Sequence, residues 1–470
     1  MTLAALIFLL IIHYCIGYGF LRLFRVQFNR VPQVCLTFLT GIVLPSFIPF
    51  LLQLAFIPIT FSSVLISLLA LCLLINILSL KKLKSFSYGS LKLHFSPSIR
   101  IYEWPFMIVF GIFLIASLWR GYYQPVFARD MLSGPEVIAE YTIKEHTMLN
   151  SFFDVNLETT NNHHKPPYIT GLQIIYKYFG FPFGQIWVCF LAIAFCVFLY
   201  CLLRQKLHPI IACTIFLLFL AMPELYAYTY ILLFDYSNMI FFFLAVYFLQ
   251  YYFRTRYVNK LYFSAALFGL ATFMRVETLV FTAMIVPALW LYAFRHKLSI
   301  RRVALYSVLL VGVPAVVYFL WVGIYLEYYI PAKFHLGPQI NQDLLNLQPL
   351  IKRFREMHSV LIFGDFGLRL WGYFFYFFIF LTAADIIITR KIDKESRTWW
   401  YAILVIYLGL PVLGFLLPLM DLMHTTKRGL FKLLPFMVLI LANNSILQAL
   451  SARITRWELP TPDAKTTSTF

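Results

Sequence analysis

Apolar runs of about twenty residues follow one another along most of this chain, and they restrict its fold more than any other feature. The runs at residues 2–19, 62–80 and 304–324 can cross about 30 Å of hydrocarbon at a helical rise of roughly 1.5 Å per residue. With 61% hydrophobic and 12% charged residues, the chain lacks the charge that a water-exposed surface requires. A transmembrane barrel would instead show short alternating segments. The sequence therefore predicts an all-α, polytopic transmembrane helical bundle.

A transmembrane helix needs about 20 residues, and counting the apolar runs by this length gives about 13 spans. They cover residues 3–21, 33–53, 62–80, 104–120, 185–203, 209–231, 236–253, 261–275, 277–294, 303–326, 366–389, 399–419 and 429–450. Basic residues gather in every second connection, from 22–30 to 453–456. The positive-inside rule makes these connections cytoplasmic, with the N-terminus outside and the C-terminus inside. Residues 261–294 must form a hairpin, because a single helix there would reverse the side of every later connection.

The net charge of +18 does not indicate nucleic acid, because the basic residues lie between spans rather than on a soluble patch. All seven cysteines fall in hydrophobic stretches, so we expect neither a disulfide framework nor a cysteine metal site. The start of the chain lacks the features of a removable signal peptide, and the first span is expected to remain as an anchor. A bacterial inner membrane is the expected location. The polar segment at 451–470 is expected to be a cytoplasmic tail.

Two long connections, 121–184 and 327–365, lie on the predicted outer side. Asp130 opens the first of them and has no helical role, so it is either a catalytic group or a loop acid paired with a neighbouring cation. Ser133-Gly134-Pro135-Glu136 matches a capping box. This pattern favours a capping role for Glu136 over a contact with substrate. An apolar stripe after Glu136 predicts a helix along the membrane interface. A second helix is expected to end at Gly180.

His163, His164 and Lys165 precede Pro166-Pro167 at the start of that second helix. Proline fixes the backbone there, so Lys165 projects from a constrained turn at a helix N-terminus, where anions bind well. The alternative is a lysine that extends to the interface beside two ordinary loop histidines. Two adjacent histidines alone indicate little about metal, and His164 is the one candidate ligand.

Further charges lie at the outer ends of predicted spans. Asp235 has the position of a helix N-cap, and Arg275 and Glu277 occupy the tip of the short hairpin. Three cations gather at the outer end of the last span, where the topology rule disfavours positive charge: Lys427, Arg428 and Lys432. An anionic partner such as a lipid phosphate explains them, and contact with ordinary anionic lipid heads explains them equally.

This ordered set of motifs resembles the GT-C superfamily of integral-membrane glycosyltransferases, in particular the protein O-mannosyltransferases and lipid A aminoarabinose transferases. The resemblance rests on four motifs in chain order: Asp130 before an amphipathic helix, Lys165-Pro166-Pro167-Tyr168 leading to Phe179-Gly180, the segment 269–275 ending in Arg275, and the segment 427–435. It covers about residues 104–450, so residues 1–103 are interpreted as an N-terminal addition of three spans.

The resemblance implies a polyprenyl-phosphate-sugar donor and an acceptor hydroxyl on a lipid, glycan or protein. Asp130 would be the general base of an inverting displacement. Donor-phosphate contacts are expected from Lys165, Arg275, Lys427, Arg428 and Lys432, and substrate contacts from Glu136, His163, His164, Asp235 and Glu277. The reaction requires no cofactor, and a divalent metal is optional.

Two other functions fit part of the pattern. A transporter of anionic or lipid-linked substrates would also be polytopic, but it should show paired halves with broken helices, and no internal repeat is evident. A polysaccharide polymerase or ligase would share the lipid-linked donor and a basic outer loop. Asp130 and the Lys-Pro-Pro motif favour the transferase over the polymerase.

Overall fold

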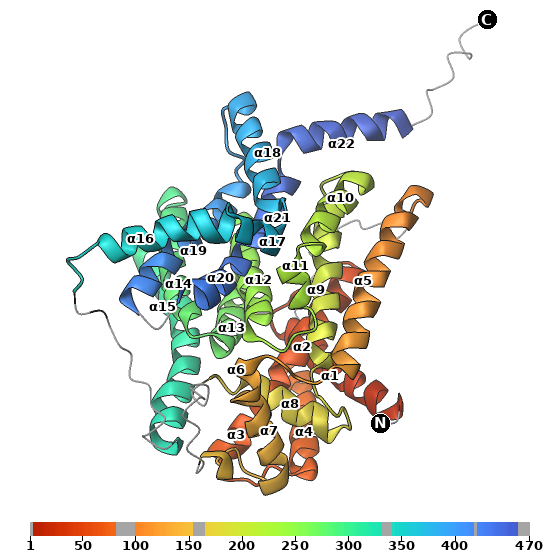
Figure 1. The fold of residues 1–470 in the computed structure, drawn as a ribbon, viewed down its shortest axis with the longest axis vertical. Coiled ribbons are helices and arrows are strands. Elements are labelled where there is room, and N and C mark those ends of the chain that lie inside the picture. The colour runs from red at the N-terminus through yellow and green to blue at the C-terminus, as the bar shows by residue number, and fades with distance from the viewer. Residues whose placement is uncertain are drawn as a thin grey trace, which may run out of the picture.

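The computed structural model describes residues 3–80, 99–153, 165–330, 341, 343–417 and 421–458. Within these ranges the chain forms helices joined by turns and short connections, without a strand (Figure 1). Eight helical segments are long and apolar enough to cross a membrane, or up to ten if each of two bent helix pairs counts as one span. The helices thus support an integral, multi-pass membrane protein.

The eight segments are α1 (Leu3–Leu23), α2 to α3 (Arg30–Leu54), α4 (Phe61–Leu80), a short 3-10 turn with α5 (Ile101–Tyr123), α9 (Ile186–Arg204), α14 (Glu277–Arg295), α15 with a π-helical extension (Ile300–Tyr329) and α19 (Ser396–Leu416). One bent pair is α17 (Asp365–Trp371) with α18 (Phe374–Thr389), at 91°; the other is Leu422–Ala442 with α22 (Ser445–Glu458), at 51°. The remaining α-helices are α6 (Arg129–Leu132), α7 (Pro135–Glu145), α8 (Tyr168–Tyr178), α10 (Pro209–Leu220), α11 (Pro223–Ala227), α12 (Phe234–Thr255), α13 (Val258–Met274) and α16 (Gln348–Glu356). Within the second bent pair lie α20 (Lys427–Gly429) and α21 (Leu434–Ala442).

Each of the 13 segments predicted as spans contains helix, but the helices differ in length from the prediction. The segment 209–231 divides into α10 and α11, and α13 is only 17 residues long. The hairpin predicted at 261–294 is present as α13 and α14, joined at Arg275 and Val276. The last predicted span was expected to end near residue 450. Instead the helix bends after Ala442, and α22 continues to Glu458 into the segment expected to be a polar tail.

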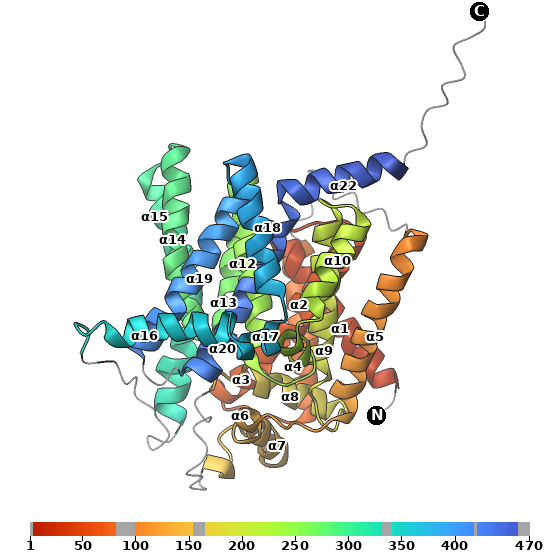
Figure 2. The same cartoon turned by 45° about the horizontal axis from the view of Figure 1, so that its top comes forward.

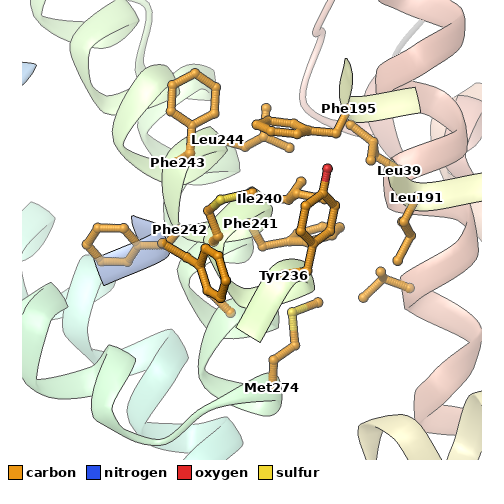
Figure 3. Packing of buried hydrophobic residues seen from close by; sticks show 14 of the residues in the cluster. Leu39, Leu191, Phe195, Tyr236, Ile240, Phe241, Phe242, Phe243, Leu244 and Met274 are labelled. Carbon is orange, nitrogen blue, oxygen red and sulfur yellow. The ribbon is translucent and has the colours of Figure 1, made fainter. Parts of the chain in front are cut away.

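Helix α12 lies at the centre of the bundle, and its sequence explains why. Phe241, Phe242 and Phe243 are each fully buried, and successive side chains on a helix point about 100° apart. Protein must therefore surround this part of the helix on several sides. Figure 3 shows Phe195 of α9 beside Phe243, with ring centroids 5.8 Å apart. By contrast, only 17% of the residues in the apolar stretch that contains α5 are buried, which fits a helix at the edge of the bundle.

The N-terminal helices pack closely against each other and against the rest of the chain. A Cβ added at Gly41 of α2 would lie 1.8 Å from the His13 carbonyl oxygen of α1, so the two backbones touch where they cross. A Cβ at Gly171 of α8 would lie 2.3 Å from the Ser46 carbonyl oxygen. Residues 1–103, predicted to be an addition, thus contact the first long connection directly through α8.

The connections divide between two ends of the bundle (Figure 2). One end holds α22, the junction of α14 with α15, and the start of α10. Side-chain contacts at this end join Arg25 to Lys260, Arg254 to Glu395, Arg256 to His296, and His208 to Glu458. These are the basic connections of the sequence, so we call this the basic end.

The opposite end holds α6, α7 and the start of α4 (Figure 2). The Met148 amide donates to Gln53 Oε1 at 2.7 Å, and the Ile59 amide donates to the His146 carbonyl at 2.7 Å. The first long connection therefore folds back over the ends of α3 and α4. The first long connection, predicted to be an outer one, thus lies at the opposite end of the bundle from the basic connections.

Candidate functional site

Asp130 lies on α6, a single helical turn that follows α5 and precedes α7. Its Oδ2 accepts a hydrogen bond from Arg428 Nη1 at 2.8 Å, across 298 residues of sequence. Burial acts to raise the pKa of Asp130, but the hydrogen bond and charge of Arg428, together with the charges of Lys165 and Arg275, outweigh it and hold the pKa below its ordinary value. The carboxylate is 35% exposed, so Asp130 is ionised and also accessible.

Arg428 lies on α20, which continues from a π-helical turn whose N-cap is Asp421. Its side chain is 16% exposed, and its Nε has no hydrogen-bond partner within the described residues. A guanidinium group offers five donors in a flat fork, so Nη1 can bond Asp130 while the buried Nε keeps unused hydrogen-bonding capacity.

A second charged group lies deeper, at the tip of the α13–α14 hairpin. Arg275 has an extended backbone between the two helices, and its Nη2 donates to Asp235 Oδ1 in the first turn of α12. Arg275 Nε is 3.7 Å from Glu277 Oε1, and Lys432 Nζ is 3.4 Å from the same oxygen. The Asp235 and Lys432 side chains are 2% and 1% exposed, so these charges neutralise one another away from water.

The predicted N-cap role of Asp235 is wrong. The helix begins at Phe234, two residues before the predicted start, with Leu233 as its N-cap, and the Asp235 carboxylate bonds Arg275 instead. A charge-assisted bond to a guanidinium is stronger than a cap bond to a backbone amide, which explains the choice of partner. Asp235 Oδ2 remains without a hydrogen-bond partner in the described part of the chain.

Lys165 supplies a cation that no carboxylate among the described residues contacts directly. Within the residues that the structure describes, its ammonium forms no hydrogen bond or ion pair. Burial and, to a smaller extent, the charge of Arg275 lower the pKa of Lys165 to about 8, against the opposing charges of Asp130 and Asp235. Lys165 nevertheless lies close enough to these charges to interact with each of them.

We define the charge cluster as Asp130, Lys165, Asp235, Arg275, Glu277, Arg428 and Lys432. These residues come from five separate stretches of the sequence, and three carboxylates face four cations in the network. The surplus positive charge, together with the partial exposure of Arg428, makes the cluster suited to an anion such as a phosphate ester.

Buried polar atoms border the cluster. Ser237 Oγ and Asn238 Oδ1 follow Asp235 on α12, Thr272 Oγ1 is near the end of α13, and the Tyr168 hydroxyl opens α8. All four are buried; Asn238 Oδ1 and Thr272 Oγ1 lack a hydrogen-bond partner among the described residues, and the Tyr168 hydroxyl and Ser237 Oγ interact only with each other. Buried polar atoms are normally paired, so water molecules, or a ligand that carries several hydroxyl groups, would satisfy them.

Glu136 does not join the cluster. Its carboxylate accepts from Gln173 Nε2 at 2.5 Å and pairs with Lys177 Nζ at 2.7 Å, both on α8. The predicted capping box is wrong: Gly134 is the N-cap of α7, and Ser133 Oγ donates to the Arg129 carbonyl. Burial raises the pKa of Glu136, against the opposing charge of Lys177. Its observed contacts join α7 to α8.

Lys427 faces away from the cluster, toward Glu224 of α11 at 2.5 Å. Sequence reasoning missed Glu224, although a cation on the predicted outer side needs a carboxylate partner and Glu224 lies in the predicted outer connection at 222–235. His163 and His164 lie outside the described residues. Within the described ranges, no group of three or more His, Cys, Asp or Glu side chains is placed to hold a metal ion.

Comparison with known proteins gives no relative for this chain. No protein-family model, no curated protein and no solved structure matches it. Any functional assignment therefore rests on the chemistry of the residues themselves.

Proposed function

We propose that this chain is an integral-membrane glycosyltransferase of the GT-C type, moving a sugar from a polyprenyl-phosphate donor to an acceptor hydroxyl. The observation that carries the proposal is the Asp130–Arg428 pair at 2.8 Å, at the accessible edge of a cluster with surplus positive charge. A proton acceptor and a phosphate-binding cation side by side are the two groups that this reaction requires.

In the proposed reaction, Asp130 takes the proton from the acceptor hydroxyl as its oxygen attacks the anomeric carbon. A new carbon–oxygen bond forms, and the bond from the anomeric carbon to the phosphate oxygen breaks. The polyprenyl phosphate leaves with that electron pair, and the anomeric configuration inverts. The low pKa of Asp130 keeps the carboxylate ionised at neutral pH, ready to accept a proton.

Arg428 connects the two halves of this chemistry. While Nη1 holds Asp130, the charge of the partly exposed guanidinium attracts the donor phosphate, so that donor binding and base positioning depend on the same side chain. Lys165 adds a second charge to the leaving phosphate, where negative charge grows in the transition state. Arg275 is committed to Asp235 and Glu277, so its proposed effect on the phosphate is a longer-range one.

The proposed sugar subsite is the buried polar border of the cluster. Hydroxyl groups of a sugar both donate and accept, so they can pair with the free carboxylate oxygen of Asp235, the amide oxygen of Asn238 and the hydroxyls of Ser237 and Tyr168. Asn238 is fixed for this purpose, because its Nδ2 donates to the Ala271 carbonyl at 2.7 Å.

The proposed membrane arrangement has about 13 spans, counted at about twenty residues per span. Helices α7 and α8 are proposed to lie along the outer interface. By the positive-inside rule the basic end is cytoplasmic, with the N-terminus outside and the C-terminus inside. The cluster then faces the extracytoplasmic side of a bacterial inner membrane. Residues 104–450 would form the catalytic unit, and residues 1–103 its addition.

The proposal is tested by incubating the purified chain with a panel of polyprenyl-phosphate sugars and membrane acceptors. We expect transfer from one donor class, and a large rise in donor KM in Arg428→Gln. Arg129→Gln is the matched control, because Arg129 adjoins Asp130 and is exposed. Equal transfer by Arg428→Gln and the wild type would refute the assigned phosphate site.

A further inference from the structure

The basic end of the bundle contains a recess of about 540 Å³ between α12, α14 and α19. Its lining includes Arg254 of α12, Arg295 of α14, and Lys394 with Arg397 at the start of α19. The ends of α12 and α14 and the start of α19, which line it, lie at the end of the bundle opposite to α6 and α7 (Figure 2). The proposed transferase reaction makes no use of this recess.

Positive charge in this recess is largely unneutralised. Glu395 is the acidic residue in its lining, and its carboxylate already contacts Lys206 and Arg254. Within the part of the chain that the structure describes, Arg295, Lys394 and Arg397 form no ion pair. Three cations thus face one recess without a carboxylate of their own, which suits a phosphate group.

The helix faces that carry these cations continue as apolar surface. Along α19, Arg397 and Tyr401 line the recess, and Leu404 follows on the same face with 50% exposure. Along α14, Arg295 is followed on the same face by Leu291, which also lines the recess and is 58% exposed. A ligand that fits both parts has a charged head and an apolar chain.

We infer that this recess binds one anionic phospholipid, with its phosphate among Arg295, Lys394 and Arg397 and an acyl chain along α14 and α19. A free phosphate would satisfy the cations but would leave Leu291 and Leu404 uncovered. A neutral phospholipid would cover the leucines but would bring its own cation into a basic recess. The anionic phospholipid is the occupant for which both charge and apolar surface are complementary.

The test is equilibrium binding of acyl-labelled phosphatidylglycerol to the purified full chain in detergent micelles, with labelled phosphatidylcholine as the neutral probe. We expect phosphatidylglycerol to bind in preference, and the Arg295→Gln/Arg397→Gln double variant to weaken it at least about tenfold. Neither arginine has an ion pair to lose within the described residues, so the fold should be retained. The matched control is Arg301→Gln/Arg302→Gln, two exposed arginines at the same end and outside the recess.

Three results would overturn the inference. Equal weakening by the control variant would show diffuse attraction to surface charge rather than a site. Displacement of the labelled lipid by inorganic phosphate at the concentration that unlabelled phosphatidylglycerol requires would identify a soluble anion as the ligand. Equal binding of phosphatidylcholine would show that the cations play no part. Because these readouts do not involve sugar transfer, they are independent of the proposed enzymatic function.

Discussion

Replacing Asp130 with asparagine tests whether this carboxylate accepts a proton or only holds Arg428. The two side chains have the same shape, and the amide oxygen of the asparagine can still accept the hydrogen bond that Arg428 Nη1 donates at 2.8 Å. What the variant loses is the negative charge and the ability to take a proton. Since a positioned general base contributes about 10²–10⁴ in rate, kcat should fall at least about a hundredfold.

The same variant should not weaken donor binding. The cluster would change from three carboxylates and four cations to two carboxylates and four cations, so its surplus positive charge rises. The donor KM should therefore stay the same or decrease. Stability should change little, because a partly exposed ion pair contributes at most about 1 kcal/mol.

Steady-state transfer kinetics, with thermal unfolding as the check on folding, separate these effects. The matched control is Asp393→Asn at the basic end. Its carboxylate accepts from the Glu395 and Ser396 amides just before and at the start of α19, and the amide oxygen of asparagine can accept the same bonds. A variant Asp130→Asn that keeps its kcat but shows a higher donor KM would refute the base role and leave Asp130 as a positioning residue for Arg428.

Further predictions concern other parts of the molecule. Because the pKa of Lys165 is about 8, kcat/KM for the donor should fall as the pH rises through that value. Lys165→Arg should remove this alkaline decline. A decline that persists in the variant would show that another group titrates. Arg275→Gln should destabilise the fold by about 3–5 kcal/mol in detergent-based thermal unfolding, because it leaves the buried Asp235 carboxylate without its cation. The double variant Asp235→Asn/Arg275→Gln should lose less stability than the sum of the losses in the two single variants. Simple additivity of the two losses would contradict the pairing. Gly41→Ala should destabilise the fold by about 1–3 kcal/mol, because the added Cβ would lie 1.8 Å from a carbonyl oxygen. Gly111→Ala is the control, because a Cβ there meets nothing within 4 Å. Equal melting temperatures for the two variants would argue against the tight crossing of α1 and α2.

The sequence allowed the helical class and most of the charge cluster to be predicted, for one physical reason. Charges are costly in an apolar chain, so a charge at the predicted outer end of a span is expected to have a partner or a function there. Asp130, Lys165, Arg275 and Arg428 were selected on this basis, and the structure brings them together. The hairpin at 261–294 followed from the alternation of basic connections.

The pairing within the cluster could not be predicted. Asp130 and Arg428 are 298 residues apart, and only the packing of helices decides that they meet. Local rules also failed where tertiary contacts are stronger. Ser133 fits a capping pattern, yet Gly134 begins the helix, and the Glu136 carboxylate turns to Lys177 and Gln173.

The most direct test of the account is to follow a labelled polyprenyl-phosphate sugar in proteoliposomes that contain the purified chain and an acceptor extract. Mass analysis of the lipid product distinguishes an enzyme from a transporter in one experiment. A glycosyltransferase releases the free polyprenyl phosphate and places the sugar on an acceptor, and Asp130→Asn should abolish that release. Recovery of intact donor, moved to the opposite leaflet with its sugar still attached, would contradict the account and identify the chain as a transporter.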